Sequence, residues 1–115
     1  MTLNARLRNH LIQSNLQVAQ RIYPEIVPTV PVYPLIVINQ PSAVPVQHRD
    51  GGQLRLVTKI LKSYAETSTA AWGVAIELRE AIRRFPGFIT SEASAYETES
   101  ARYLVVTVAQ FWSQE

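Results

Sequence analysis

The side chains that could take part in catalysis are few in this sequence. It contains two histidines, His10 and His48, one aspartate, Asp50, and no cysteine. Without cysteine there is no thiolate nucleophile, no disulfide and no thiolate-ligated zinc or iron–sulfur site. His48 and Asp50 could act together as a base and the group that orients it, but the Asp-Gly-Gly run at this point is typical of a solvated turn. His10 lies among the leucines of a predicted helix, which favours a packing role.

Paired carboxylates are the next candidates for acid–base chemistry. Glu97 and Glu99 follow Glu92 closely and flank a predicted hairpin turn, where charges keep the turn hydrated and the strand edge unpaired. No H-E-x-x-H, H-x-H or D-x-D-x-D pattern is present, and the four glycines form neither a phosphate loop nor a dinucleotide-binding fingerprint. We therefore predict a protein without metal, cofactor or enzymatic activity.

The length and composition describe the scaffold that positions these residues. With 115 residues, 47% hydrophobic and 17% charged, the chain is expected to form one globular domain over residues 1–115. Six of the seven prolines lie between positions 24 and 45, which excludes a transmembrane helix from the uncharged run 26–48. The N-terminus lacks the pattern of a secretion signal, so we expect a soluble cytoplasmic product.

Hydrophobic periodicity predicts an α+β fold in the order α-β-β-α-β-β, with an antiparallel four-stranded sheet and both helices on one face. The stronger helix signal runs from Thr67 to Phe85 and stops at Pro86-Gly87. The other predicted elements are a short helix after Thr2 and strands at 35–38, 53–64, 88–95 and 101–112.

The strand at 53–64 alternates between apolar and polar residues. We expect Leu56 and Ile60 to face the core and Arg55 and Lys59 to face solvent. The preceding strand is expected to join it through a long loop at 40–52, because two prolines and the Asp-Gly-Gly run lie there. A loop of this length in a compact domain is generally functional or mobile.

The last predicted strand has two apolar faces. Leu104, Val106, Val108 and Trp112 share one side, and Tyr103, Val105, Ala109 and Phe111 share the other. Antiparallel sheets in monomers usually expose one face to solvent. The strand is therefore either a central core strand or part of a subunit interface, and the sequence leaves both open.

Charge is divided unevenly along the chain. Residues 1–62 carry a balance of +5, and residues 63–115 carry a balance of −3. The positive residues are spread over a helix, a turn and a strand, whereas nucleic-acid binding usually needs a concentrated basic face. A molecule with two signs of charge suits stacking against copies of itself or against unlike neighbours.

The order of these elements resembles the small tail-terminator, or tail completion, proteins of long-tailed bacteriophages and prophages. The resemblance spans nearly the whole chain. It is carried by the short N-terminal helix, Arg21-Ile22-Tyr23-Pro24, the strand Pro34 to Ile38, Asp50-Gly51-Gly52, the strand Leu54 to Tyr64, the helix from Ala71-Trp72 to Ile82-Arg83, and the final Phe111-Trp112.

The resemblance implies a structural virion protein. Such proteins form a ring, commonly a hexamer, at the head-proximal end of the tail tube, where the ring halts tube polymerisation and joins the tail to the head connector. The implied partners are copies of the chain itself, the tail tube protein and the connector protein, with DNA passing through the ring without sequence-specific binding. The implied location is the virion tail, and the host cytoplasm during assembly.

Two sets of residues are expected to mediate this assembly. We predict a subunit interface in which a basic patch meets an acidic one beside an apolar strand face, formed by Arg55, Lys59, Glu97, Glu99, Tyr103, Val105 and Phe111. We predict that the loop at 40–52 docks on the tube or connector through Val44, Val46, Arg49 and Asp50.

Two other functional classes stay open. A small α+β domain that binds RNA or a ligand would use the same layers, and RNA binding would need exposed aromatic residues interleaved with Lys or Arg on one sheet face. Arg55 and Lys59 are the one such basic pair on a strand. An enzyme built as a dimeric α+β barrel is the third class.

Overall fold

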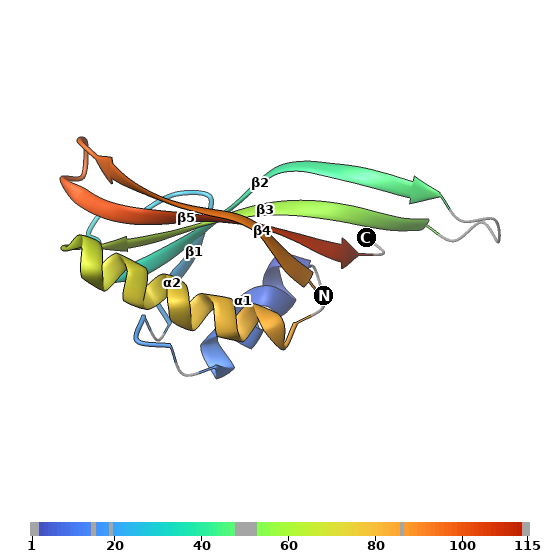
Figure 1. Cartoon of the computed structure of the whole chain (residues 1–115), viewed down its shortest axis with the longest axis horizontal. Coiled ribbons are helices and arrows are strands. Elements are labelled where there is room, and N and C mark those ends of the chain that lie inside the picture. Colours follow the sequence, from blue (N-terminus) through green and yellow to red (C-terminus); the bar gives the residue numbers. More distant parts are fainter. Residues whose placement is uncertain (1–2, 15, 19, 48–52, 86, 114–115) are drawn as a thin grey trace.

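A five-stranded mixed sheet covered on one side by two helices forms the protein (Figure 1). The computed structural model describes residues 3–14, 16–18, 20–47, 53–85 and 87–113, and it describes only the backbone of residues 4, 40–47, 53–55 and 113. The elements are α1 (Leu3–Gln13), β1 (Ile22–Pro24), β2 (Leu35–Gln47), β3 (Gln53–Ala65), α2 (Ser68–Arg83), β4 (Gly87–Glu97) and β5 (Arg102–Ser113).

The strands lie in the order β1-β2-β3-β5-β4. All neighbours are antiparallel except β1 and β2, which are parallel. The α+β class is therefore confirmed, whereas the predicted four-stranded antiparallel sheet is wrong, because β1 adds a fifth, parallel strand. At three residues β1 is too short to show a periodic pattern. It is held by backbone hydrogen bonds from Ile36 N to Arg21 O (3.0 Å) and from Glu25 N to Ile38 O (2.9 Å).

α2 forms where the sequence predicts it. The hydroxyl of Thr67 caps its N-terminus by accepting a hydrogen bond from the Ala70 backbone N–H (3.1 Å). Residues at helical spacing make one buried stripe, comprising Ala71, Val74, Ala75, Leu78, Ala81 and Ile82. No helix among the described residues is long and apolar enough to cross a membrane.

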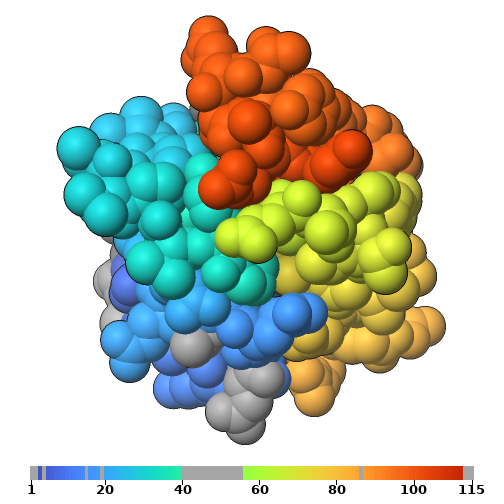
Figure 2. All heavy atoms as spheres, turned by 90° about the vertical axis from the view of Figure 1, so that its left-hand side faces the viewer, coloured from blue at the N-terminus to red at the C-terminus, as the bar shows by residue number. Residues whose placement is uncertain are grey.

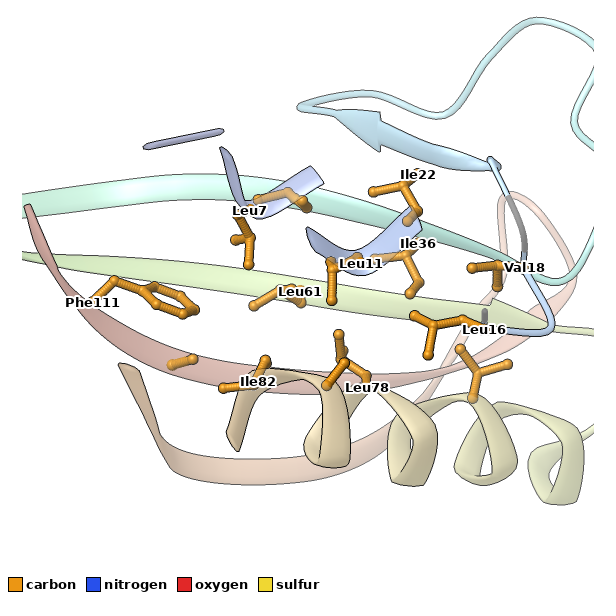
Figure 3. Close-up of a cluster of buried hydrophobic side chains, with 14 of the residues drawn as sticks. Leu7, Leu11, Leu16, Val18, Ile22, Ile36, Leu61, Leu78, Ile82 and Phe111 are labelled. Carbon is orange, nitrogen blue, oxygen red and sulfur yellow. The ribbon is translucent and has the colours of Figure 1, made fainter. Parts of the chain in front are cut away.

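The main core lies between the helices and the sheet (Figure 3). α1 contributes Leu7 and Leu11, α2 contributes Leu78 and Ile82, and the sheet and its connecting segments contribute the other residues labelled there, Leu16, Val18, Ile22, Ile36, Leu61 and Phe111. All of these are at most 6% exposed. Burial of this apolar surface is the main force that holds both helices on the same face of the sheet.

The predicted loop at 40–52 is wrong for residues 40–47, which belong to β2. The pairing of β2 with β3 continues from Ser42 opposite Thr58 to Gln47 opposite Gln53, after an irregularity between Asn39 and Ser42. Prolines are tolerated here because β1 pairs only with residues 36–38, which leaves the rest of β2 at the edge of the sheet. Residues 48–52 lie outside the described residues.

The face assignment of β3 is also the reverse of the prediction. Val57, Lys59 and Leu61 are buried on the side of the helices. Leu56 and Ile60, predicted to face the core, lie on the opposite side of the sheet and are half-buried. Strand alternation allows either choice, and the larger apolar surface of the two helices decides which side becomes the main core.

Candidate interaction surface

The potentially catalytic residues are not assembled into a site in the described part of the chain. His10 packs against the Phe85 ring, with a centroid distance of 5.2 Å, and its Nε2 donates to the carbonyl of Ala81 (2.6 Å). It thereby ties α1 to the last turn of α2. His48 and Asp50 lie outside the described residues, and the described residues contain no group of three His, Cys, Asp or Glu side chains that could hold a metal ion.

A surface hollow of about 400 Å³ lies between α2 and the start of β4. Two of its lining residues are arginines that already have carboxylate partners. Arg79 Nε and Nη2 donate to the two carboxylate oxygens of Glu92 (3.0 and 3.2 Å), and Arg83 Nη1 donates to Glu80 (3.1 Å). The carboxylate of Glu92 raises the pKa of Arg79. The hollow therefore offers an anionic ligand little charge that is not already balanced.

Lys59 does not contribute to the predicted basic patch. Its side chain is 1% exposed and lies on the side of the helices, so it cannot reach a neighbouring subunit. The backbone of Arg55 pairs with Pro45 and Ser113, and its side chain is among those not described. The predicted docking loop is divided in the same way: Val44 and Val46 belong to β2, and Arg49 and Asp50 lie outside the described residues.

The side of β5 that is predicted to form the interface is largely core. Val105 and Phe111 have no exposed surface, and they pack against the alanines of α2 and against the main core respectively. Tyr103 is exposed, and its ring meets Tyr96 edge-on at a centroid distance of 5.0 Å. Of the three β5 residues, only Tyr103 can contact a partner without unfolding the sheet, and a charge placed at Val105 is expected to unfold the protein rather than to block assembly.

The two glutamates of the predicted acidic patch differ in their surroundings. Glu97 accepts a hydrogen bond from the hydroxyl of Tyr64 (2.9 Å), across the intervening strand β5. Burial and this carboxylate together raise the pKa of Tyr64 well above its ordinary value. Glu99 is exposed in the β4–β5 turn and is available to a partner.

The face of the sheet opposite the helices carries a second, smaller core at one end. Residues 25–34, here called the proline segment, cover this end, and Val27 and Tyr33 pack against Leu35, Val37, Tyr64 and Leu104. The guanidinium of Arg102 lies over the Tyr33 ring, 4.6 Å from its centroid. Figure 2 shows the proline segment, sky blue to cyan, as a lobe beside the orange-red β4–β5 turn.

The other end of the same face is apolar but open. Trp112 and Phe88 are 44% and 45% exposed, which is unusual for side chains of this size. Register places Trp112 opposite Leu56, Phe88 opposite Gln110, and Val108 opposite Ile60, so these residues share the face turned away from the helices. Phe88, at the start of the edge strand β4, also lines the hollow beside α2. We call this set, Leu56, Ile60, Phe88, Val108 and Trp112, the open face.

The fold is one that occurs in a virus-like particle. A chain of a solved structure described as the virion of a native gene transfer agent (GTA) particle matches with a TM-score of 0.79 and 8% sequence identity, over 98% of this chain and 95% of that chain. No family model and no curated protein sequence matches. At this identity the likeness shows a shared fold across nearly the whole length of both chains.

The apolar character of both sides of β5 is evident from the sequence, but the surface that it creates is not. The apolar residues Val108 and Trp112 are the sequence signal for the open face, whereas the predicted interface uses the opposite side of β5. The signal for the proline segment was the presence of Ile26, Val30 and Val32 among prolines, where a solvated linker would carry polar residues.

Proposed function

We propose that this protein is a structural component of a phage-like virion, and specifically a tail terminator that forms a ring at the head-proximal end of the tail tube. The observation that carries the proposal is the match in fold, over nearly the whole of both chains, to a chain of a gene transfer agent virion. The order of elements in the sequence, which resembles the tail-terminator family, supports the finer role. In this role the ring ends tube polymerisation and joins the tail to the head connector.

The surface supports an assembly role rather than a reaction. Exposed apolar side chains occur on the open face and on the proline segment, and exposed patches of this kind mark sites of protein association. We propose that the protein is not an enzyme, takes no cofactor, and acts through contacts with its own copies, with the tube protein and with the connector protein, while DNA passes through the ring.

The predicted contact residues that stay available refine this proposal. Glu99 and Tyr103 are exposed at the β4–β5 end of the molecule and are proposed to contact a neighbouring subunit. Arg49 and Asp50, between β2 and β3, are proposed to contact the tube or the connector. The RNA-binding alternative loses Lys59 from its proposed basic pair, because that side chain is buried among the helices and the sheet.

The proposal is tested with a tail tube protein from the genome that encodes this chain. That protein is polymerised with and without this one, and tube lengths are measured by negative-stain electron microscopy. We expect shorter tubes of defined length with a ring at one end, and uncontrolled lengths when this protein is heat-denatured first. Tubes of the same length distribution in both samples, without rings, would show that the protein is not a terminator.

A further inference from the structure

The open face is suited to a protein–protein contact that excludes water. Thr58 and Gln110 lie between its apolar side chains, and Gln110 Nε2 lies 3.4 Å from Thr58 Oγ1, so they satisfy part of each other's hydrogen-bonding capacity. Asn39, opposite Ile60, and Ser91, opposite Val108, border the face. The five residues of the open face are all uncharged. Covering these five side chains therefore buries mainly apolar area, and the nearest charged group on the same side of β3 is Lys62, two residues beyond Ile60.

A second apolar surface lies on the outward side of the proline segment. Ile26, Val30 and Val32 are 74%, 83% and 57% exposed, the highest values among the large hydrophobic residues described. Their neighbours Val27 and Tyr33 already pack on the sheet of the same chain, so the segment is anchored with its outward residues presented to a partner. Anchoring lowers the conformational entropy that is lost on binding.

The chemistry of the proline segment matches a sheet face rather than a sheet edge. Pro28, Pro31 and Pro34 have no backbone N–H, so the segment is a poor partner for strand addition and binds best through its side chains. Glu25 is its single charged residue. The uncharged aliphatic side chains of Ile26, Val30 and Val32 and the uncharged open face thus occur at different ends of one side of the same molecule.

We propose that the open face of one copy receives Ile26, Val30 and Val32 of the next copy. The two surfaces differ, so the contact is heterologous, and repetition of a heterologous contact closes into a ring when the rotation fits. This deepens the ring of the proposed function by naming its joint. It replaces the predicted joint through Val105 and Phe111, which are buried within the subunit.

The absence of cysteine makes the joint directly testable by cross-linking. Val30→Cys and Trp112→Cys are made as single variants and together in one chain. Ile76→Cys is the matched control, since Ile76 is an exposed apolar residue (51%) of α2, on the other side of the sheet. All three side chains are exposed, so the variants are expected to fold, which circular dichroism checks.

On mild oxidation, the double variant should give a ladder of covalent oligomers that ends at one closed size. An equimolar mixture of the Val30→Cys and Trp112→Cys chains should give cross-linked dimers at a yield several-fold above that of either chain alone, and of Val30→Cys mixed with Ile76→Cys. Dimers of Trp112→Cys alone at equal yield would show face-to-face pairing and overturn the proposal. Yields that do not differ from those of the control mixture would overturn it as well.

The two proposals can fail separately. A ladder in cross-linking without any effect on tube length would keep this joint and remove the terminator function. Rings and shortened tubes formed by a Trp112→Glu chain would keep the function and remove this joint.

Discussion

The hydroxyl of Tyr64 shows how one polar contact can brace the sheet. This hydroxyl, on β3, donates a hydrogen bond to the carboxylate of Glu97 on β4. The bond therefore spans the intervening strand β5, at the end of the sheet that the proline segment covers. Removing it leaves a carboxylate without this donor in partly buried surroundings. Such losses usually reduce stability by about 1 kcal/mol or somewhat more.

Tyr64→Phe is therefore expected to lower the free energy of unfolding at pH 7, and the deficit should depend on pH. Because the pKa of Tyr64 is raised in the folded state, the unfolded chain releases this proton first as pH increases. The stabilisation is present below the ordinary tyrosine pKa of about 10 and declines above it. Urea unfolding between pH 7 and 11 should show the wild type and Tyr64→Phe converging at high pH.

The control for this measurement is Tyr96→Phe, whose ring is exposed and keeps its edge-on contact with Tyr103. It should change stability by no more than about 0.5 kcal/mol. A Tyr64→Phe deficit that is constant over the whole pH range would contradict the raised pKa.

Alanine substitutions at two glycines distinguish an effect of packing from an effect of helix propensity. A Cβ at Gly87 would overlap the buried Phe111 ring and lie 2.9 Å from the Gln110 carbonyl, whereas a Cβ at Gly73 of α2 meets only the Gln17 side-chain amide at 3.6 Å. Gly87→Ala should reduce stability by about 1–3 kcal/mol through overpacking. Gly73→Ala should be neutral or stabilise by up to about 1 kcal/mol, because alanine is the better helix former. Equal effects in chemical denaturation would rule out the close approach at Gly87.

The β2–β3 hairpin is part of the folded sheet rather than an appended loop. Deleting residues 43–49 removes five strand pairs, from Ala43–Val57 to Gln47–Gln53. Val57 is 5% exposed and belongs to the main core. We expect this deletion to reduce stability clearly, with a lower urea midpoint, because β3 loses its edge neighbour beside a core residue.

A matched variant replaces residues 48–52 with Asn-Gly, which favours a two-residue hairpin turn and keeps all five pairs. Its stability should remain within about 1 kcal/mol of the wild type. If the 43–49 deletion is as stable as this variant, the outer half of the hairpin contributes nothing to the fold.

The elements that could be predicted from the sequence are those with a long, one-sided pattern. α2 has a cap, a continuous apolar stripe and a stop signal, so its position was predicted closely. β1 could not be predicted, because three residues have no period and the strand depends on its partner Ile36. The outer half of β2 was missed because proline usually argues against a strand, and only knowledge of the sheet order shows that this half is an edge.

The candidate surface is only partly predictable from the sequence. The sequence shows that both sides of β5 are apolar, and the choice between them depends on which side the helices cover. That choice is cooperative, because α1, α2 and the buried side of β3 select it together. The burial of Lys59 on that side is the clearest example, since a lysine in an alternating strand ordinarily indicates the solvated face.

Mixing two charge variants tests the head-to-tail architecture of the whole assembly. Val30→Glu places a charge on the proline segment and leaves the open face intact, while Trp112→Glu does the reverse. Each variant alone should fail to assemble, since every joint then contains one carboxylate that is desolvated without a partner.

In an equimolar mixture, the open face of a Val30→Glu chain can still bind the proline segment of a Trp112→Glu chain, because neither of these two surfaces is substituted. Assembly stops at this dimer, because the two surfaces that remain free both carry the introduced charge. Light scattering should therefore report dimers in the mixture, monomers in each separate sample, and wild-type assembly for the control Ile76→Glu. Full rings in the mixture, or no association at all, would contradict a heterologous joint between these two surfaces.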